Sequence, residues 1–408
     1  MHTGARLAQR LLVIVSLLSA SADATRAQET APPQDVKDTA PATPPPAPVV
    51  VVSQPGASSG GLDDIAGRVQ HWFDPDRNGF YPWVGSIMPG GWLAGGGGYR
   101  HELVRGIKVD ALAGISLRNY KLLDAGLTVP VTSDDRVLVE VRTRLMDAPR
   151  VHFYGLGNES SHDVETRFDY EPKRIDARLR LRPTSQAEIG ASVGLLHVGT
   201  GLGSVGPPIT DVFTPAEVPG LLQSASYRTM ALYAQADRRD TRVFTRAGGW
   251  YRADWQLFAD GDTRAFGHQR VDLDVRQFFP IVDERHAVLA RGVFTGTRAS
   301  GTDLVPHFMM PTLGDGENLR GFANQRFTDR HRLLLQGEYR YRINDRLHAA
   351  GFVDLGRVAP RLGDLSFADL HPGYGVGLRM QTAEGLSIRT DIARSSEQWS
   401  IIVSSVIF

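Results

Sequence analysis

Apolar and polar side chains alternate along many segments of this chain from Gly79 onward. The alternation is clearest over residues 108–118, 136–145 and 175–182. In the first of these segments the apolar positions are Val109, Ala111, Ala113, Ile115 and Leu117. A period of two places successive side chains on opposite faces of a β-strand. The pattern therefore predicts strands with one apolar and one polar face, of roughly the 9 to 12 residues that cross a bilayer when tilted.

Sixteen such segments are predicted, and they lie near residues 80, 92, 108, 136, 150, 173, 186, 226, 247, 268, 286, 332, 346, 373, 386 and 399. Short turns are predicted at residues 147–150, 182–185 and 279–283, and long loops at 156–172, 199–224 and 298–331. Single-chain bacterial membrane barrels have an even number of strands with short turns at one end and long loops at the other. The fold class predicted is all-β, a 16-stranded antiparallel transmembrane β-barrel over residues 64–408.

A soluble β-sandwich would show the same alternation, with its apolar face packed against a second sheet and its polar face in water. The polar positions of this chain carry many arginines, and the chain has no cysteine with which a secreted sandwich could be cross-linked. These features favour lipid outside the sheet and a charged interior.

The first 27 residues have the three parts of a secretory signal peptide. Arg6 and Arg10 precede an apolar run over residues 11–20, and small residues offer cleavage after Ala24 or Ala27. An uncleaved amphipathic start is the alternative. No later run reaches the ~20 apolar residues of a membrane helix, so a β-barrel is the remaining way to cross a bilayer.

Residues 28–61 are rich in Pro, Ala, Thr and Ser. This composition cannot bury a core and predicts a disordered, polyproline-like tether ahead of the barrel.

Composition excludes several classes of function. The 45 basic and 45 acidic residues give no net charge, so nucleic acid is not an expected partner. The absence of cysteine excludes lipidation at the cleavage site and thiolate metal sites. The 12 histidines have no metal-ligand spacing, and no Ser/His/acid set shares a plausible register. We therefore expect no catalytic residues, no metal and no cofactor, and a protein that is not an enzyme.

The most informative segment is the glycine-rich stretch over residues 314–322, which carries Arg320 between Leu319 and Gly321-Phe322. Two carboxylates follow on predicted strands, and the parity of their neighbours places Glu338 and Asp354 on the interior face. A buried arginine needs carboxylate partners, and the fixed fork of its guanidinium suits two of them.

Here the chain resembles the BamA/TamA-type outer-membrane insertase and translocase superfamily, also called bacterial surface antigens. In that family a Val/Leu-Arg-Gly-Phe/Tyr tetrad lies on a loop folded back into the barrel, where its arginine meets acidic residues of the following strands. Leu319-Arg320-Gly321-Phe322 fits the tetrad, Glu338 fits the next strand, and Phe352-x-Asp354-x-Gly356 fits the strand after it. The segment over residues 153–158, which contains Gly155 and Gly157, also looks like a segment that recurs in the barrels of this family. Phe408 fits the C-terminal aromatic residue that the outer-membrane assembly machinery recognises in this class.

The resemblance implies a barrel in the outer membrane of a Gram-negative bacterium, with the tether in the periplasm. Most relatives carry periplasmic POTRA domains, for which residues 28–61 have no room, so the chain is similar to a POTRA-less branch. The implied function is help with inserting or translocating polypeptide, or lipid. The implied partners are outer-membrane lipid, a client polypeptide and a separate periplasmic protein. A passive pore or structural surface antigen is the alternative.

The glycines at residues 95–98 leave two interpretations open. They can give simple curvature to a strand, or they can lower the cost of opening a seam between the first and last strands.

Overall fold

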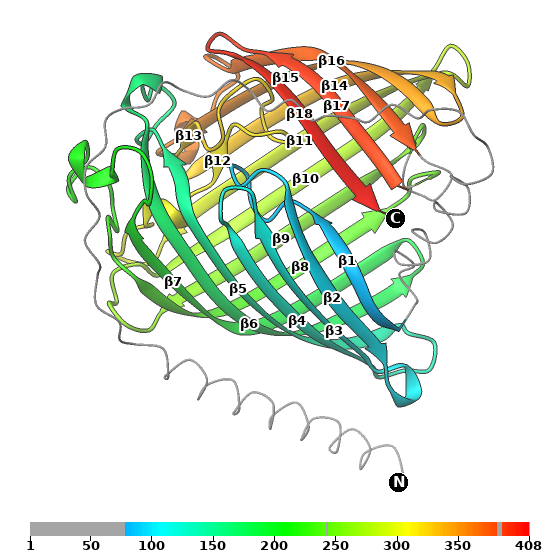
Figure 1. The fold of residues 1–408 in the computed structure, drawn as a ribbon, viewed down its shortest axis with the longest axis horizontal. Helices are drawn as coiled ribbons and strands as arrows, with labels where there is room; N and C mark the ends of the chain where they lie inside the picture. The colour runs from blue at the N-terminus through cyan, green and yellow to red at the C-terminus, as the bar shows by residue number, and fades with distance from the viewer. Residues whose placement is uncertain (1–77, 242–243, 382–385, 408) are drawn as a thin grey trace. The chain divides into compact units, whose positions relative to one another are not determined.

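A computed structural model of the protein describes residues 78–241, 244–381 and 386–407. These residues form one antiparallel sheet in which sixteen strands follow one another in sequence order and curl into a barrel (Figure 1). The strands are β1 (Gly79–Gly85), β2 (Ala94–Glu102), β3 (Lys108–Ser116), β4 (Lys121–Pro130), β5 (Val137–Phe153), β6 (Thr166–Thr184), β7 (Ala187–Leu202), β8 (Ala225–Asp237), β9 (Gly248–Asp260), β10 (His268–Ile281), β11 (His286–Ala299), β14 (His331–Asn344), β15 (Leu347–Ala359), β16 (His371–Gln381), β17 (Leu386–Arg394) and β18 (Trp399–Ile407).

The long connection between β11 and β14 contains a second, two-stranded sheet of β12 (Thr312–Leu313) and β13 (Phe327–Thr328). The short 3-10 helices are η1 (Val104–Gly106), η2 (His162–Val164), η3 (Ile209–Asp211), η4 (His307–Met309) and η5 (Leu362–Asp364). In the described part of the chain, no helix is long and apolar enough to cross a membrane.

Side chains alternate between the outer face and the lumen as the sequence predicts. On β10, for example, Leu273 and Val275 are exposed on the outer face, whereas Asp272 and Asp274 lie between them on the lumen side. Apolar side chains are likewise exposed on the outer face of other strands, among them Leu123, Leu145, Leu179, Val193, Leu232, Val353, Val376 and Ile401. A barrel with an apolar outside and a charged inside suits a bilayer.

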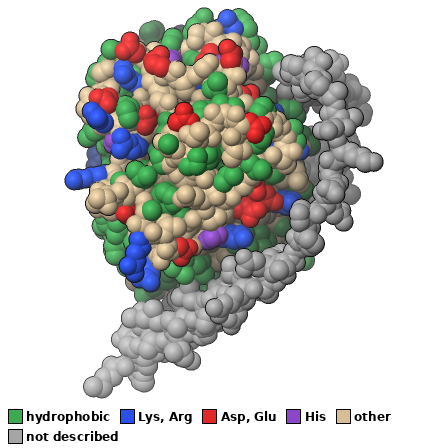
Figure 2. Space-filling view, turned by 90° about the vertical axis from the view of Figure 1, so that its left-hand side faces the viewer, with side chains coloured by type: hydrophobic (Ala, Val, Ile, Leu, Met, Phe, Trp, Pro, Cys, Tyr) green, Lys and Arg blue, Asp and Glu red, His purple; other side chains and the backbone are tan. Residues whose placement is uncertain are grey.

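The two ends of the barrel differ. At the end where β1 begins, here called the turn end, the connections include the short turns at residues 185–186 and 345–346. At the other, the loop end, long loops run over residues 154–165, 203–224 and 300–330. Figure 2 shows the molecule from the side on which the loops after β5 and β7 lie, where hydrophobic, acidic and basic side chains are interspersed.

One predicted strand position was wrong and one strand was missed, although the number of strands is confirmed. The segment near 150 belongs to β5, in which residues 147–150 form an irregularity between Ala148 and Val151 rather than a turn. Pro149 is tolerated there because a bulge leaves one residue out of the hydrogen-bonded ladder. The strand β4 was not predicted, because Leu122 faces the lumen beside outward Leu123 and so interrupts the alternation.

The sheet is open between its first and last strands. Along the described residues the hydrogen-bonded order runs from β1 to β18, and no ladder joins these two strands although they lie next to each other. The edge of β18 therefore has backbone groups without strand partners. We call this boundary the seam.

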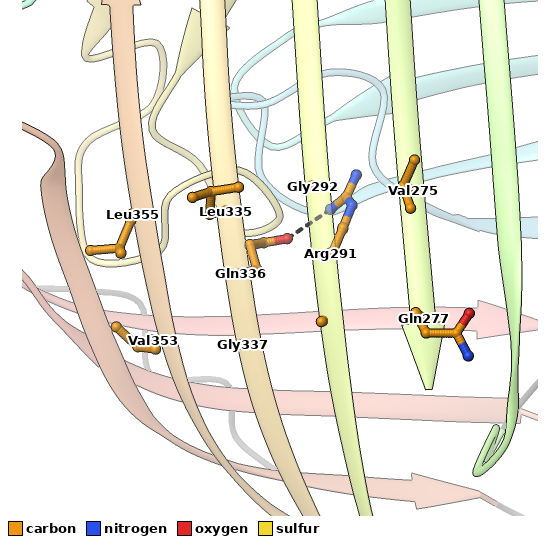
Figure 3. Close-up of a pocket in the computed structure, with 10 residues that line it drawn as sticks. Val275, Gln277, Arg291, Gly292, Leu335, Gln336, Gly337, Val353 and Leu355 are labelled. Carbon is orange, nitrogen blue, oxygen red and sulfur yellow. Dashed lines mark hydrogen bonds between the residues drawn. The ribbon is translucent and has the colours of Figure 1, made fainter. Parts of the chain in front are cut away.

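The outer wall has a shallow apolar groove of about 400 Å³ over β10, β11, β14 and β15 (Figure 3). Ala290, Gly292 and Gly337 leave space for it because they have little or no side chain. The polar side chains of Arg291 and Gln336 hydrogen-bond to each other at 2.9 Å. The groove is part of the apolar outer surface, next to which a membrane barrel places lipid.

Several predictions fall on residues that the structure does not describe. The signal peptide at residues 1–27, the tether at 28–61 and the aromatic Phe408 lie outside the described residues.

Candidate functional site

The site is built on a strained turn near the tip of the 300–330 loop. Leu319 and Gly321, on either side of Arg320, have positive φ values of 65° and 94°. A branched residue such as leucine rarely adopts this conformation, so surrounding contacts must hold it. The turn directs the Arg320 side chain into the barrel wall, where only 2% of the residue is exposed.

Asp354 on β15 binds Arg320 at three points. The Nε and Nη2 atoms donate to the two carboxylate oxygens at 2.7 and 2.6 Å, and the Arg320 backbone N–H donates to Oδ2 at 3.0 Å. Such a fork-to-fork pair with an added backbone bond fixes both the side chain and the loop. The Asp354 carboxylate is fully buried.

Three alternate residues of β15 contact the loop, each in a different way. The guanidinium of Arg320 lies 3.4 Å from the centre of the Phe352 ring, a cation–π arrangement. Asp354 supplies the opposite charge. Gly356 leaves room for Leu319, because a Cβ at this position would lie 3.0 Å from a Leu319 methyl carbon. The Phe-x-Asp-x-Gly pattern is thus a single lumen-facing surface that matches the loop.

Two further carboxylates surround the guanidinium. Glu338 on β14 accepts from Nη1 at 3.0 Å, and Asp391 on β17 accepts from the same atom at 3.3 Å. Both of these carboxylates also bind other arginines, which are Arg340 and Arg379 for Glu338, and Arg379 and Arg389 for Asp391. The site therefore holds Arg320 of the loop together with three arginines and three carboxylates from the four adjacent strands β14 to β17.

Sequence reasoning predicted Arg320, Glu338 and Asp354 as partners, and the structure brings all three together. It missed Asp391 and Arg379. The alternation contained a signal for Asp391, because Arg389 and Asp391 share parity between the apolar residues Ile388 and Ile392.

The rest of the tetrad packs into apolar surroundings at the loop end of the lumen. Leu319 and Phe322 belong to a buried cluster with Val293, Leu313, Phe327, Leu334 and Val358. Gly321 lies against the end of β17, where a Cβ would come within 2.8 Å of the Arg394 carbonyl carbon. Glycine is therefore required there both by φ and by space.

Gly155 and Gly157 lie in the 154–165 loop and have φ values of 91° and 100°. The Gly157 N–H donates to the carbonyl of Thr328 on β13 at 2.9 Å. The next residue, Asn158, accepts from the Val358 N–H at 3.2 Å and contacts His371 through its carbonyl at 2.9 Å. This segment thus joins the tetrad loop to the loop ends of β15 and β16.

Many of the lumen arginines are paired. Arg252 and Arg276 bind carboxylates two residues away at 2.7 and 2.8 Å, and Arg291 binds Asp274 at 2.8 Å. Arg142 contacts Asp110, Asp124 and Glu140. Interspersed charges therefore neutralise much of the lumen.

One group of carboxylates in the described residues could approach a metal ion, namely Asp147, Asp169 and Glu171, with ligand atoms within 4.8 Å of one another. It lies beside two lysines. Lys121 is 2.7 Å from Asp147, and Lys173 is 3.8 Å from Glu171. These cations already offset part of the negative charge, and no other observation indicates a ligand.

The family is decided by sequence comparison. The Omp85 superfamily domain matches residues 124–398, which include the tetrad, Glu338, Asp354 and Asp391. The chain belongs to the Omp85 superfamily. Membership implies that this Omp85 barrel lies in an outer membrane. A comparison with curated protein sequences finds no match.

A solved structure shares the fold. BamA from Haemophilus ducreyi lacking POTRA domains 1–3 is 13% identical, with a TM-score of 0.62 over 81% of this chain and 71% of that one. CdiB from Acinetobacter baumannii is 14% identical, with a TM-score of 0.46 over 80% of this chain and 59% of that one. At such identities the first comparison establishes the Omp85 barrel architecture alone.

Proposed function

We propose that this Omp85 barrel assists the insertion or translocation of polypeptide at the outer membrane, without enzymatic chemistry. The observation that carries the proposal is the open edge of β18, which has no ladder to β1 in the described residues. An unpaired strand edge is a template for an added strand. A client strand could therefore pair there while it enters the bilayer. Lipid is the second class of cargo that such a seam admits.

In this proposal the turn end and the tether at residues 28–61 face the periplasm, and the loop end faces outward. The support is the distribution of connections, because outer-membrane barrels have short periplasmic turns and long outer loops. A separate periplasmic partner would deliver the client to the turn end.

The Arg320 site has a structural part in this function. It ties the loop to β14, β15 and β17, which lie close to the seam in strand order. Because β14, β15 and β17 are held by the loop, we expect the barrel to open at the unpaired edge of β18.

The first strand is fixed to β2 in a different way. Tyr81 and Trp83 lie over Gly98 and Gly114, where a Cβ would come within 2.2 and 2.7 Å of their rings. The glycines of β2 and β3 thus make room for two lumen-facing aromatic side chains of β1. This contact stabilises β1 against β2 without any contribution from the seam.

A passive pore or structural surface barrel is the second candidate. The observation that favours it is the pairing of many lumen arginines with carboxylates. These ion pairs neutralise much of the charge that could otherwise bind a client polypeptide.

Depletion of the protein followed by quantitative proteomics of the outer membrane separates the two. The proposal expects selective loss of one or a few outer-membrane clients, restored by the wild type and not by a variant lacking residues 312–328. Unchanged client levels, with altered conductance as the only effect of the deletion, would favour the passive pore.

A further inference from the structure

A second arginine of the loop, Arg326, is buried at the loop end with only 3% of the residue exposed. Its Nε donates to both carboxylate oxygens of Glu397 at 2.9 Å. Glu397 lies in the turn over residues 395–398 that joins β17 to β18. The loop is therefore bound to the hairpin whose outer edge forms the seam.

The same turn contacts the tetrad. The Ser395 hydroxyl donates to the Gly321 carbonyl at 2.7 Å. Ser395 Oγ also accepts from the N–H groups of Glu397 and Gln398, at 3.1 and 3.3 Å. These bonds hold the turn in one conformation and place Glu397 in front of Arg326.

On its other side, Arg326 binds the 154–165 loop. Nη1 donates to Ser160 Oγ at 2.9 Å, and Nη2 donates to the Ser160 carbonyl at 2.5 Å. The guanidinium also lies 4.4 Å from the centre of the Phe327 ring and 5.1 Å from that of Tyr154. Arg326 thus joins three segments that are far apart in sequence.

The contact between the loop and the body of β18 is weaker than this ion pair. At mid-strand, Ile402 lies against Gly316 of the loop, which is an apolar contact without a hydrogen bond. Separating the loop end of this hairpin would leave a buried arginine without its carboxylate, which is costly. Separating the loop from β18 further along the strand would break this apolar contact rather than a buried ion pair.

We propose that Arg326 is a positioning residue that fixes the loop-end turn of the β17–β18 hairpin, so that the seam opens from the turn end while its loop end stays shut. The anchoring stands on the contacts above. The further step, that a client strand enters the seam at the turn end, rests on the proposed function.

Spin-label distances test this inference directly, since the chain has no native cysteine. One label pair uses exposed Val84 and Ile401, near the loop ends of β1 and β18. The second pair uses exposed Phe80 and Val403, nearer the turn end. Each pair is introduced as cysteines, labelled with nitroxide and measured in proteoliposomes.

We expect a narrow distance distribution for the Val84/Ile401 pair and a broader one for the Phe80/Val403 pair. Glu397→Gln should widen the loop-end distribution until it resembles that of the turn-end pair. Glu284→Gln, which neutralises an exposed carboxylate in a connection at the turn end, is the matched control and should leave the Val84/Ile401 distribution unchanged. Arg326→Lys keeps the charge without the fork and should give an intermediate width.

A loop-end pair as broad as the turn-end pair in the wild type would overturn the inference. A narrow distance distribution for the loop-end pair in both the Glu397→Gln and the Arg326→Lys proteins would also overturn it, provided that both proteins still show heat-modifiable gel mobility. Distances that follow the expectation in a protein without client activity would leave the anchor in place and count against the proposed function alone.

Discussion

Among the residues that the structure describes, the carboxylate of Asp354 is hydrogen-bonded by Arg320 alone, at 2.6 and 2.7 Å from the side chain and 3.0 Å from the backbone. The two other carboxylates of the site differ in this respect. Glu338 and Asp391 keep bonds from Arg340, Arg379 and Arg389 when Arg320 is removed. Asp354 is therefore the residue that depends on Arg320.

Arg320→Ala should release the loop before it unfolds the barrel. Removal of one partner of a buried ion pair costs about 3 to 5 kcal/mol, and hydration of the vacated space would reduce that figure. We expect faster protease cleavage between residues 300 and 330, with heat-modifiable gel mobility retained. Cleavage at the wild-type rate would contradict this assignment.

The double variant Arg320→Met with Asp354→Asn distinguishes loss of the pair from loss of packing. It removes the unpaired charge, so it should be less protease-sensitive than Arg320→Ala in the same assay. Arg320→Lys should fall between the wild type and Arg320→Ala, because lysine offers a point charge in place of a fork.

Gly356→Val should displace Leu319 and with it the tetrad turn. A Cβ at Gly356 already lies 3.0 Å from Leu313 and Leu319, and overpacking of this kind costs about 1 to 3 kcal/mol. Gly351→Val on the same strand is the matched control, because a Cβ there meets nothing within 4 Å. Thermal unfolding in detergent should show a lower midpoint for the first variant only. Equal midpoints would mean that Leu319 does not need this space.

Gly98→Ala should loosen β1 from β2. Its Cβ would lie 2.2 Å from Tyr81, which must then leave its place beneath the Arg100 guanidinium. Gly97→Ala adds the same methyl group on the outer face, where the nearest atom is 3.9 Å away. Hydrogen exchange of the β1 amides should accelerate in the first variant and stay near the wild-type rate in the second. Equal acceleration would indicate a general effect of losing glycine.

Acid should loosen the start of the 300–330 loop. Burial lowers the pKa of His307 to about 4, against the opposing effect of its hydrogen bond to the Pro219 carbonyl. This pKa lies below the ordinary value of about 6.5, so the folded loop is favoured while His307 is neutral. The contribution of neutral His307 to the stability of the folded loop is therefore present above pH 6.5 and is lost as the pH falls towards 4. The pKa of Glu165 in the neighbouring loop is lowered to about 2, by its hydrogen bond from His152, so that carboxylate stays ionised throughout.

Limited proteolysis between about pH 7 and pH 4.5 checks this expectation. Cleavage in the loop should rise in the wild type as the pH falls, and His307→Gln should weaken the dependence. A pH profile that is identical in the two proteins would assign the effect to other groups.

The strands and the parity of the site residues could be predicted from the sequence because both depend on the period of two. Glu338 and Asp354 were placed in the lumen by their neighbours alone, and both face it. The same rule failed at β4 and at Pro149, where an inward leucine and a bulge break the period.

The remainder of the site could not be predicted because it depends on contacts between distant segments. Arg326 meets Glu397 and Ser160, and neither local propensity nor alternation carries information about such pairs. The same holds for Asn158, whose hydrogen bonds reach β15 and β16. These contacts are fixed only when the loops fold over the finished barrel.

The central claim, that the barrel assists insertion with a wall fixed by Arg320, is tested most directly by client folding in proteoliposomes. The rate at which a small unfolded outer-membrane barrel becomes heat-modifiable is measured with wild-type protein, with Arg320→Ala and with empty liposomes. We expect acceleration by the wild type and a smaller acceleration by Arg320→Ala. A wild-type rate equal to that of empty liposomes, for several clients and with a correctly folded barrel, would contradict the account.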